Sequence, residues 1–122
     1  MPGSVAVDAA GNVYVTDYAV GQVLKLAAGA ATPTVLPFTP LDGLGGIAVD
    51  TAGDLYVTAA GANPLLKLAT AASTPTVVPL TGLQGPPGGV AVGTAGDLYL
   101  TDNRVLKVAA GADHPTVLPF TA

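Results

Sequence analysis

Short runs of β-branched and aliphatic residues recur along the chain, separated by turns rich in glycine, proline, asparagine and alanine. In the first unit these runs cover residues 5–8, 13–17, 23–26 and 34–38. Runs of this length between turn residues are typical of β-strands, and no stretch has the spacing of an amphipathic helix. The pattern therefore predicts an all-β chain whose units each contain four short strands.

One heptapeptide recurs almost unchanged in the second strand of each unit: GNVYVTD from Gly11, GDLYVTA from Gly53 and GDLYLTD from Gly96. Successive copies are 42 and 43 residues apart. A period of this length indicates an array in which each unit buries its apolar face against its neighbours. We therefore expect residues 1–122 to form a single repeat array, with units at residues 1–41, 42–83 and 84–122.

Glycine and proline indicate how the strands of a unit are ordered. Gly11 and its counterparts stand beside Asn or Asp between the first two strands, where a tight hairpin needs positive φ. Each unit is therefore predicted to be an antiparallel meander. Pro37, Pro79 and Pro119 fall in the fourth run, and because proline lacks the N–H of a central strand, this run is predicted at the edge. The small first run, residues 5–7, suits a crowded centre. Four-stranded sheets arranged radially in this way form a β-propeller.

The repeated segments resemble NHL-repeat β-propellers, whose units run as GVAVD, GNVYVTD, an Asn-x-Arg turn and VLKL. The matching segments include GIAVD at residues 46–50, GNVYVTD at residues 11–17 and VLKL at residues 23–26. The chain is especially similar to the propeller sensor domains of bacterial receptor Ser/Thr kinases and to the designed Pizza propellers. The turn departs from the family pattern in the first two units, whereas the third unit keeps Arg104 in a shorter turn.

Three blades fall short of a closed propeller, which takes about four to eight. We expect two copies to pair as a homodimer, each supplying half of a six-bladed ring. An open set of three blades would expose an apolar face at each end, beyond the ~300–600 Å² patch that soluble monomers carry. The chain begins on an inner strand and ends on an outer one, so closure is expected to rest on contact between whole blades. The alternative is a piece of a longer propeller, such as an extracellular sensor domain, whose other blades complete the ring.

Composition restricts the expected partners. Half of the residues are hydrophobic, yet polar residues, glycine or proline interrupt every apolar stretch before the ~18 residues of a membrane-spanning helix. The N-terminus lacks the basic and apolar segments of a signal peptide. Eight aspartates, no glutamate and four basic residues give a net charge of -4, which repels phosphate backbones, so neither nucleic acid nor a membrane is an expected partner. The absence of cysteine excludes disulfides and thiolate–metal sites.

Candidates for catalysis are few. His114 is the only histidine, Asp113 precedes it, and Ser73 lies in the matching loop of the previous unit. These loops lead into outer strands of different blades, so we expect an exposed loop histidine rather than a catalytic triad. One histidine also falls short of the three protein ligands that a catalytic zinc takes. We therefore expect no catalytic residue, no metal site, no cofactor and no enzymatic activity.

Several recurring acidic residues are expected to stabilise turns. Asp8 and Asp50 end inner strands, so a dimer would place four such carboxylates around the propeller axis. Carboxylates in that arrangement suit a cation that takes oxygen ligands. An Asx-type cap of the following hairpin is favoured instead, and Gly93 interrupts the series in the third unit. Asp17 and Asp102 end the second strand of their units, and we expect them to accept backbone donors of the next turn.

Other recurring residues are expected to pack or to face solvent. The tyrosines of the second strands are predicted to pack between blades and the lysines of the third strands to point outward. These are Tyr14, Tyr56 and Tyr99, and Lys25, Lys67 and Lys107. The segments Gly43–Gly46 and Gly85–Gly89 lack the lysine and the following helix of a phosphate-binding loop, so we expect turns between blades there.

The residues that do not repeat form the candidate recognition face. They lie in the links between second and third strands and in the links between blades, which share one face of a propeller, and loops on a rigid scaffold carry specificity. The candidates are Tyr18, Val20, Gln22, Asp42, Asn63, Gln84, Asp102, Asn103 and Arg104. We therefore predict a non-enzymatic scaffold or recognition module that binds a protein or a small molecule on this face. The alternative is a metal-dependent enzyme similar to propeller lyases or lactonases, which use clustered His, Glu or Asp at the axis.

Overall fold

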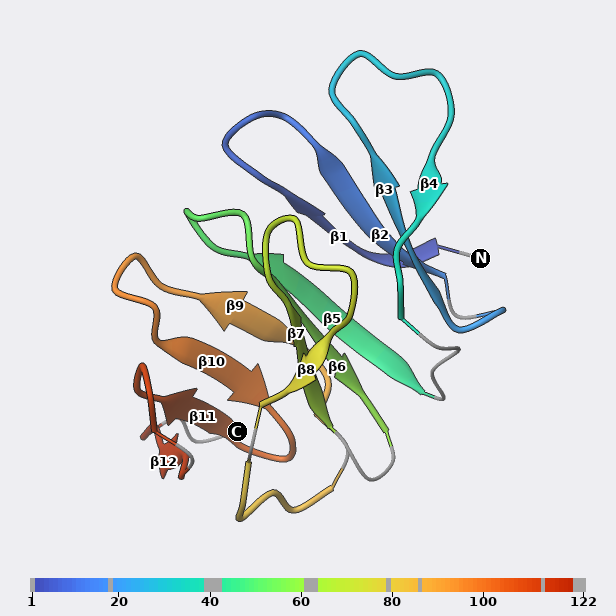
Figure 1. Ribbon diagram of the computed structural model, residues 1–122. Coiled ribbons are helices and arrows are strands. Elements are labelled where there is room, and N and C mark those ends of the chain that lie inside the picture. The colour runs from blue at the N-terminus through green and yellow to red at the C-terminus, as the bar shows by residue number, and fades with distance from the viewer. Residues whose placement is uncertain are drawn as a thin grey trace.

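The computed structural model describes residues 2–17, 19–38, 43–60, 64–78, 80–85, 87–112 and 114–119. The strands form three four-stranded antiparallel sheets (Figure 1). This arrangement confirms the all-β class and the four-stranded units predicted from the sequence. Within the described ranges, no helix is long and apolar enough to cross a membrane.

Each sheet, called a blade below, consists of four strands that follow one another in the chain. Blade one contains β1 (Pro2–Val7), β2 (Val13–Asp17), β3 (Gln22–Leu26) and β4 (Thr34–Val35). Blade two contains β5 (Leu44–Val49), β6 (Leu55–Ala59), β7 (Leu65–Leu68) and β8 (Thr76–Val77). Blade three contains β9 (Val90–Val92), β10 (Leu98–Thr101), β11 (Val105–Val108) and β12 (Thr116–Val117).

The blades meet at a hub formed by their first strands. β5 contacts both β1 and β9, whereas β4, β8 and β12 contact only the third strand of their own blade among the described elements. Figure 1 shows the three sheets one after another, with blade two between blades one and three. The small apolar first run of each unit therefore lies at the crowded centre, as predicted.

Glycine shapes the hairpin between the first and second strand of each blade. Gly11 and Gly53 have φ of 87°, and Gly96 has φ of 90°. L side chains rarely adopt this conformation, so glycine is needed at the turn. The Gly53 N–H donates to the Asp50 carbonyl at 3.0 Å, and the other two hairpins repeat this bond. The hairpins predicted from the Gly-Asn and Gly-Asp pairs are confirmed.

The outer strands are shorter than the sequence predicts. β4 ends at Val35, so Pro37 lies beyond the strand rather than inside it. The Leu36 N–H still donates to the Val23 carbonyl at 2.9 Å, and pairing then stops because Pro37 has no N–H to donate. In blade three the same position is Pro119, which follows β12, whereas Pro79 lies outside the described residues. The edge position of the fourth strand is confirmed, and the placement of proline within it is corrected.

The glycine-rich segment at Gly43–Gly46 is only partly a turn. Gly43 has the positive φ of a turn, at 60°, but Gly45 and Gly46 belong to the inner strand β5. A Cβ added to Gly45 would lie 2.5 Å from the Gly88 carbonyl oxygen of blade three. The prediction of a simple turn between blades is therefore wrong here, because glycine is needed where two backbones approach each other closely.

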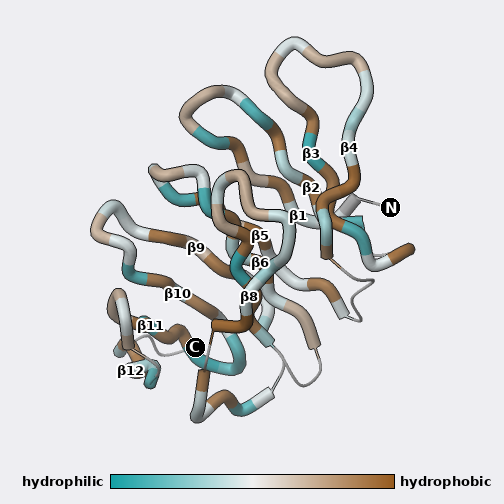
Figure 2. The backbone as a smooth tube through the Cα atoms, viewed as in Figure 1, coloured by the Kyte–Doolittle hydropathy of each residue, from teal (hydrophilic) through white to brown (hydrophobic). Residues whose placement is uncertain are grey.

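The hydrophobic core lies between the blades. One buried cluster joins blades one and two and includes Tyr14, Val23, Ile47 and Val57. A second cluster joins blades two and three and contains Tyr56, Leu65, Leu98, Leu100, Leu106 and Val108. Figure 2 shows the corresponding hydrophobic segments along the strands of all three sheets. Each blade is therefore stabilised by apolar area that it buries against its neighbour.

Candidate functional site

Two of the links predicted to form the recognition face lie together in blade three. The Gln84 N–H, in the link that leads from β8 to β9, donates to Asp102 Oδ2 at 2.9 Å. Arg104, in the turn between β10 and β11, donates from Nη2 to the Gly82 carbonyl at 2.9 Å. These bonds fasten the link between blades to the turn of the following blade, so both loops are held in a fixed arrangement.

Asp102 and Arg104 form the ion pair at the centre of this arrangement. Arg104 Nη2 lies 2.9 Å from Asp102 Oδ2, and the side chains are 26% and 1% exposed respectively. The Arg104 backbone N–H also donates to Asp102 Oδ1 at 2.8 Å, which confirms the predicted turn contact. The hydrogen bonds from Arg104 hold the pKa of the Asp102 carboxyl well below its usual value. Both side chains are thus engaged in internal contacts.

The remaining candidates of the recognition face differ in accessibility. Gln22 is the first residue of β3, pairs with Asp17 and is half-buried. Gln84 and Asn103 are exposed, and Val20 is 53% exposed. Tyr18, Asp42 and Asn63 lie outside the described residues. Gln84 and Asn103 therefore present polar side chains to solvent beside the ion pair.

Aspartates cap the hairpins of the first two blades. Asp8 Oδ1 accepts the N–H groups of Ala10 and Asn12 at 3.0 and 2.9 Å. Asp50 Oδ1 accepts the corresponding two donors of its own hairpin at 3.0 and 2.9 Å. The hydrogen bond from the Asn12 side chain is the main cause that lowers the pKa of Asp8. The Asx cap favoured by the sequence is confirmed, while Gly93 supplies only backbone bonds at the equivalent hairpin.

The capping aspartates also hold the buried tyrosines. The Tyr14 hydroxyl donates to Asp8 Oδ2 at 2.9 Å, and the Tyr56 hydroxyl donates to Asp50 Oδ2 at 3.2 Å. Tyr14 and Tyr56 are 5% and 7% exposed and belong to the two clusters between blades, so their predicted packing is confirmed. Burial is the main cause that raises the pKa of both tyrosines.

The recurring lysines lie over the tyrosines rather than pointing away from the blades. The Nζ atoms of Lys25, Lys67 and Lys107 are 5.8, 5.6 and 6.0 Å from the ring centroids of the paired tyrosines. Lys67 Nζ also lies 3.5 Å from Asp54 Oδ2, and Lys107 Nζ lies 3.6 Å from Asp97 Oδ2. The prediction that they point outward is corrected, because the pleat places the paired tyrosine and lysine on one face of the sheet.

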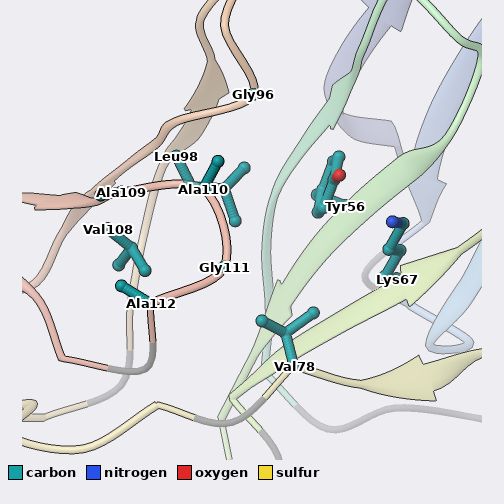
Figure 3. A pocket seen from close by; sticks show the side chains of 10 residues that line it. All are labelled: Tyr56, Lys67, Val78, Gly96, Leu98, Val108, Ala109, Ala110, Gly111 and Ala112. Carbon is teal, nitrogen blue, oxygen red and sulfur yellow. The ribbon is translucent and has the colours of Figure 1, made fainter.

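A hollow of about 640 Å³ lies between blades two and three and is lined on the side of blade two by Tyr56, Lys67 and Val78. Figure 3 shows Tyr56 and Lys67 on the wall of blade two, across from Val108 and the turn that includes Ala110. The polar groups of this hollow are paired with carboxylates of their own blade, Tyr56 with Asp50 and Lys67 with Asp54.

The lone histidine lies on an exposed loop, as predicted. His114 Nδ1 is 2.9 Å from Thr81 Oγ1. Asp113 lies outside the described residues, and Ser73 is exposed. No group of three His, Cys, Asp or Glu side chains in the part of the chain that the structure describes is placed to hold a metal ion.

The threonines of the repeated heptapeptide have a role that the sequence did not predict. Thr16 and Thr58 accept, at Oγ1, an N–H of the inner strand of their own blade at 2.9 and 2.8 Å, and Thr101 accepts the N–H of Gly89, just before β9, at 2.9 Å. Thr16 and Thr58 are fully buried, whereas Thr101 is exposed. Their recurrence in all three heptapeptides was the signal that identifies them.

The sequence comparison with known proteins finds local similarity. No protein-family model matches the chain. A segment of 41 residues, 33% of this chain, is 58% identical to the serine/threonine-protein kinase PknD of Mycobacterium tuberculosis and covers 6% of that kinase. The match therefore concerns about one repeat unit and a small part of the kinase.

Solved structures resemble almost the whole chain. The TM-score is 0.81 with the nidogen/laminin complex, at 22% identity, covering 95% of this chain and 47% of that chain. It is 0.78 with streptogramin B lyase, at 23% identity, covering 98% and 41% of the two chains. It is 0.80 with the gluconolactonase XC5397 of Xanthomonas campestris, at 19% identity, covering 99% and 48%. This chain therefore spans less than half of each neighbour, and the neighbours are β-propellers. Its three four-stranded sheets are three blades of a β-propeller.

Proposed function

We propose that this chain is a non-enzymatic recognition or scaffold module of the NHL-repeat type, in which two copies each supply three blades of a six-bladed ring. The observation that carries the proposal is the exposed apolar face of blade one. Val5 and Val7 of β1 are 63% and 59% exposed, whereas Ile47, which occupies the position of Val5 in blade two, is 5% exposed. Blade one covers Ile47, and a further blade is needed to cover Val5 in the same way.

The opposite face of blade three is uncovered as well. Thr101 and Ala91 are exposed there, whereas their counterparts in blade two, Thr58 and Ala48, are 0% and 7% exposed. Burying about 500 Å² of apolar surface at one junction offers roughly 12 kcal/mol at about 25 cal/mol per Å², before the cost of association. Two copies bury both faces at once, because each copy offers one face of each kind.

The NHL type and the recognition role have separate support. The repeated GNVYVTD segments carry the family resemblance, and about one repeat is 58% identical to a serine/threonine-protein kinase. The Asp102–Arg104 pair fixes the loops around Gln84 and Asn103, which leaves two exposed polar side chains on a rigid support. Such a surface suits a protein or small-molecule ligand held by hydrogen bonds.

Sedimentation equilibrium of the purified chain at several concentrations tests the ring. The proposal predicts a mass twice the 11.8 kDa of one chain. A mass of one chain at every concentration overturns pairing and favours a longer propeller whose own blades complete the ring. The likeness to lyase and lactonase structures provides the enzymatic alternative, and stoichiometric metal in the purified dimer would support that alternative against a non-enzymatic module.

A further inference from the structure

Blades two and three make a polar contact at the hub, where β5 and β6 meet the segment just before β9. The Gly46 N–H donates to the Gly88 carbonyl at 2.8 Å, and Thr58 Oγ1 donates to the same carbonyl at 2.7 Å. We call Gly46, Thr58 and Gly88 the hub clasp. A Cβ added to Gly46 would lie 2.8 Å from Val90 N, so the clasp requires glycine at this position.

Blade three carries the same two donors on its free face. Gly89 and Thr101 occupy the positions of Gly46 and Thr58 in the repeat. The Gly89 N–H donates to Thr101 Oγ1 at 2.9 Å, as Gly46 does to Thr58 at 2.8 Å. A Cβ added to Gly89 would meet only Thr101 Oγ1, at an ordinary van der Waals distance of 3.6 Å. The neighbours described within this chain therefore do not require glycine at position 89.

Blade one carries the matching acceptor. Gly3 occupies the position of Gly88, whose carbonyl accepts both donors of the hub clasp. The junction of blades one and two differs in sequence, because Ser4 rather than glycine stands at the position of Gly46, although the Ser4 N–H donates to Thr16 as the Gly46 N–H does to Thr58. If blade three of one copy met blade one of another copy, the blade that supplies the donors would carry Gly88 and Gly89. Blade two carries Gly45 and Gly46 in the same way at its junction with blade three.

The free face of blade one also has an apolar hollow. Between blades two and three, Tyr56 and Lys67 of one blade face apolar residues of the next (Figure 3). On the free face of blade one, a hollow of about 290 Å³ is lined by apolar residues alone, and these are Val13, Val15, Leu24, Leu26, Ala31 and Pro33. Blade three presents the missing pair, Tyr99 and Lys107, on its own free face.

We propose that Gly89 N–H and Thr101 Oγ1 of one copy donate to the Gly3 carbonyl of a second copy, which forms a hub clasp between chains. This inference rests on the proposed function, because it names the residues through which the two halves join. The occupant of the hollow is a second copy because blade three supplies both the tyrosine–lysine pair and the two donors that this acceptor takes. Two-fold symmetry gives the ring two such clasps.

Sedimentation equilibrium of single-residue variants tests the clasp. Thr101→Val removes one donor, and a lost hydrogen bond weakens binding about fivefold, so two clasps predict a dissociation constant raised about 25-fold. Gly89→Ala is expected to weaken the dimer more, because its methyl group occupies space that the second backbone needs. The matched controls are Thr94→Val, on an exposed turn of the same blade, and Gly93→Ala, at a position where the other two blades carry aspartate.

The outcomes separate the clasp from the ring itself. A dimeric wild type, weakened by both test variants and unchanged by both controls, supports the clasp. If the wild type is dimeric and the test variants associate as tightly as the controls, the clasp is overturned. The proposed ring would then be held by another contact. A wild type that is monomeric at every concentration overturns both. Far-UV circular dichroism reports folding, and if Gly89→Ala unfolds, Thr101→Val decides the question, because it removes only a hydroxyl group.

Discussion

Thr58 is the residue whose removal most directly measures the contact between neighbouring blades. Its side chain is fully buried, accepts the Gly46 N–H at 2.8 Å and donates to the Gly88 carbonyl at 2.7 Å. Thr58→Val keeps the shape of the side chain and removes both hydrogen bonds. The Gly46 N–H and the Gly88 carbonyl keep each other as partners at 2.8 Å, so neither group is left unpaired.

The expected loss follows from these two bonds. Two hydrogen bonds of about 0.5–1.5 kcal/mol each contribute about 1–3 kcal/mol, and the added methyl group offsets about 0.8 kcal/mol of this. We therefore expect Thr58→Val to lower the free energy of unfolding by about 0.2–2.2 kcal/mol, with a central value of about 1 kcal/mol, which corresponds to a melting temperature lower by roughly 4 °C. The measurement is urea unfolding at one fixed protein concentration, because association changes apparent stability.

Thr94→Val is the control, since Thr94 lies on an exposed turn, where substitutions change stability by less than about 0.5 kcal/mol. A Thr58→Val chain as stable as this control would contradict the prediction, because it would mean that the hub bonds contribute nothing to holding the blades together.

Three further predictions concern single positions. Gly93→Asp should raise the melting temperature, because the aspartate at the equivalent position of blade one accepts hydrogen bonds from a tyrosine hydroxyl and two N–H groups. A variant that melts at or below the wild-type temperature would contradict this. Arg104 lowers the pKa of Asp102 below its usual 3.8, so ionised Asp102 stabilises the fold at neutral pH and this contribution falls as the pH drops below about 3.8. The stability difference between the wild type and Asp102→Asn, measured by urea unfolding across this range, should therefore shrink on acidification, and a constant difference would exclude the ion pair as its cause. Leu106→Ala leaves a cavity at a fully buried site between blades two and three and should cost about 2–5 kcal/mol by the same measurement, whereas a loss below about 1 kcal/mol would contradict the packing described.

Much of the blade could be predicted from local patterns. The alternation of apolar runs and turn residues gave the four strands, and Gly11, Gly53 and Gly96 adopt the positive φ that their place beside Asn or Asp indicates. The packing of Tyr14 and Tyr56 also followed, because large apolar side chains at one position of every repeat are expected at the repeating interface. These features depend on residues close together in the chain or on strict repetition.

The errors concern contacts between blades and the register of neighbouring strands. Gly45 and Gly46 resemble turn glycines in the sequence, and only the approach of Gly88 from another blade shows why a strand contains them. The lysines were expected to point outward, but register pairs Tyr14 with Lys25 and so places both on one face. Register could have been inferred from the hairpin lengths.

The loop contacts could not have been inferred from composition alone. Arg104 was a candidate for the recognition face from its place in a link that does not repeat, and the structure shows that it donates to Asp102 and to the Gly82 carbonyl. The partners of a long, flexible side chain depend on loop geometry, which the sequence leaves undetermined in a link that does not repeat. Gln84 and Asn103 beside it are exposed and present polar side chains to solvent.

We propose that two copies of this chain complete one ring, and a crystal structure of the purified chain would show how the ring closes. We expect six blades around one axis, with the β10 threonine of each copy against the first strand of the other and the exposed valines of β1 covered. Blades stacked in a line, or a single copy whose end faces stay uncovered, would contradict it.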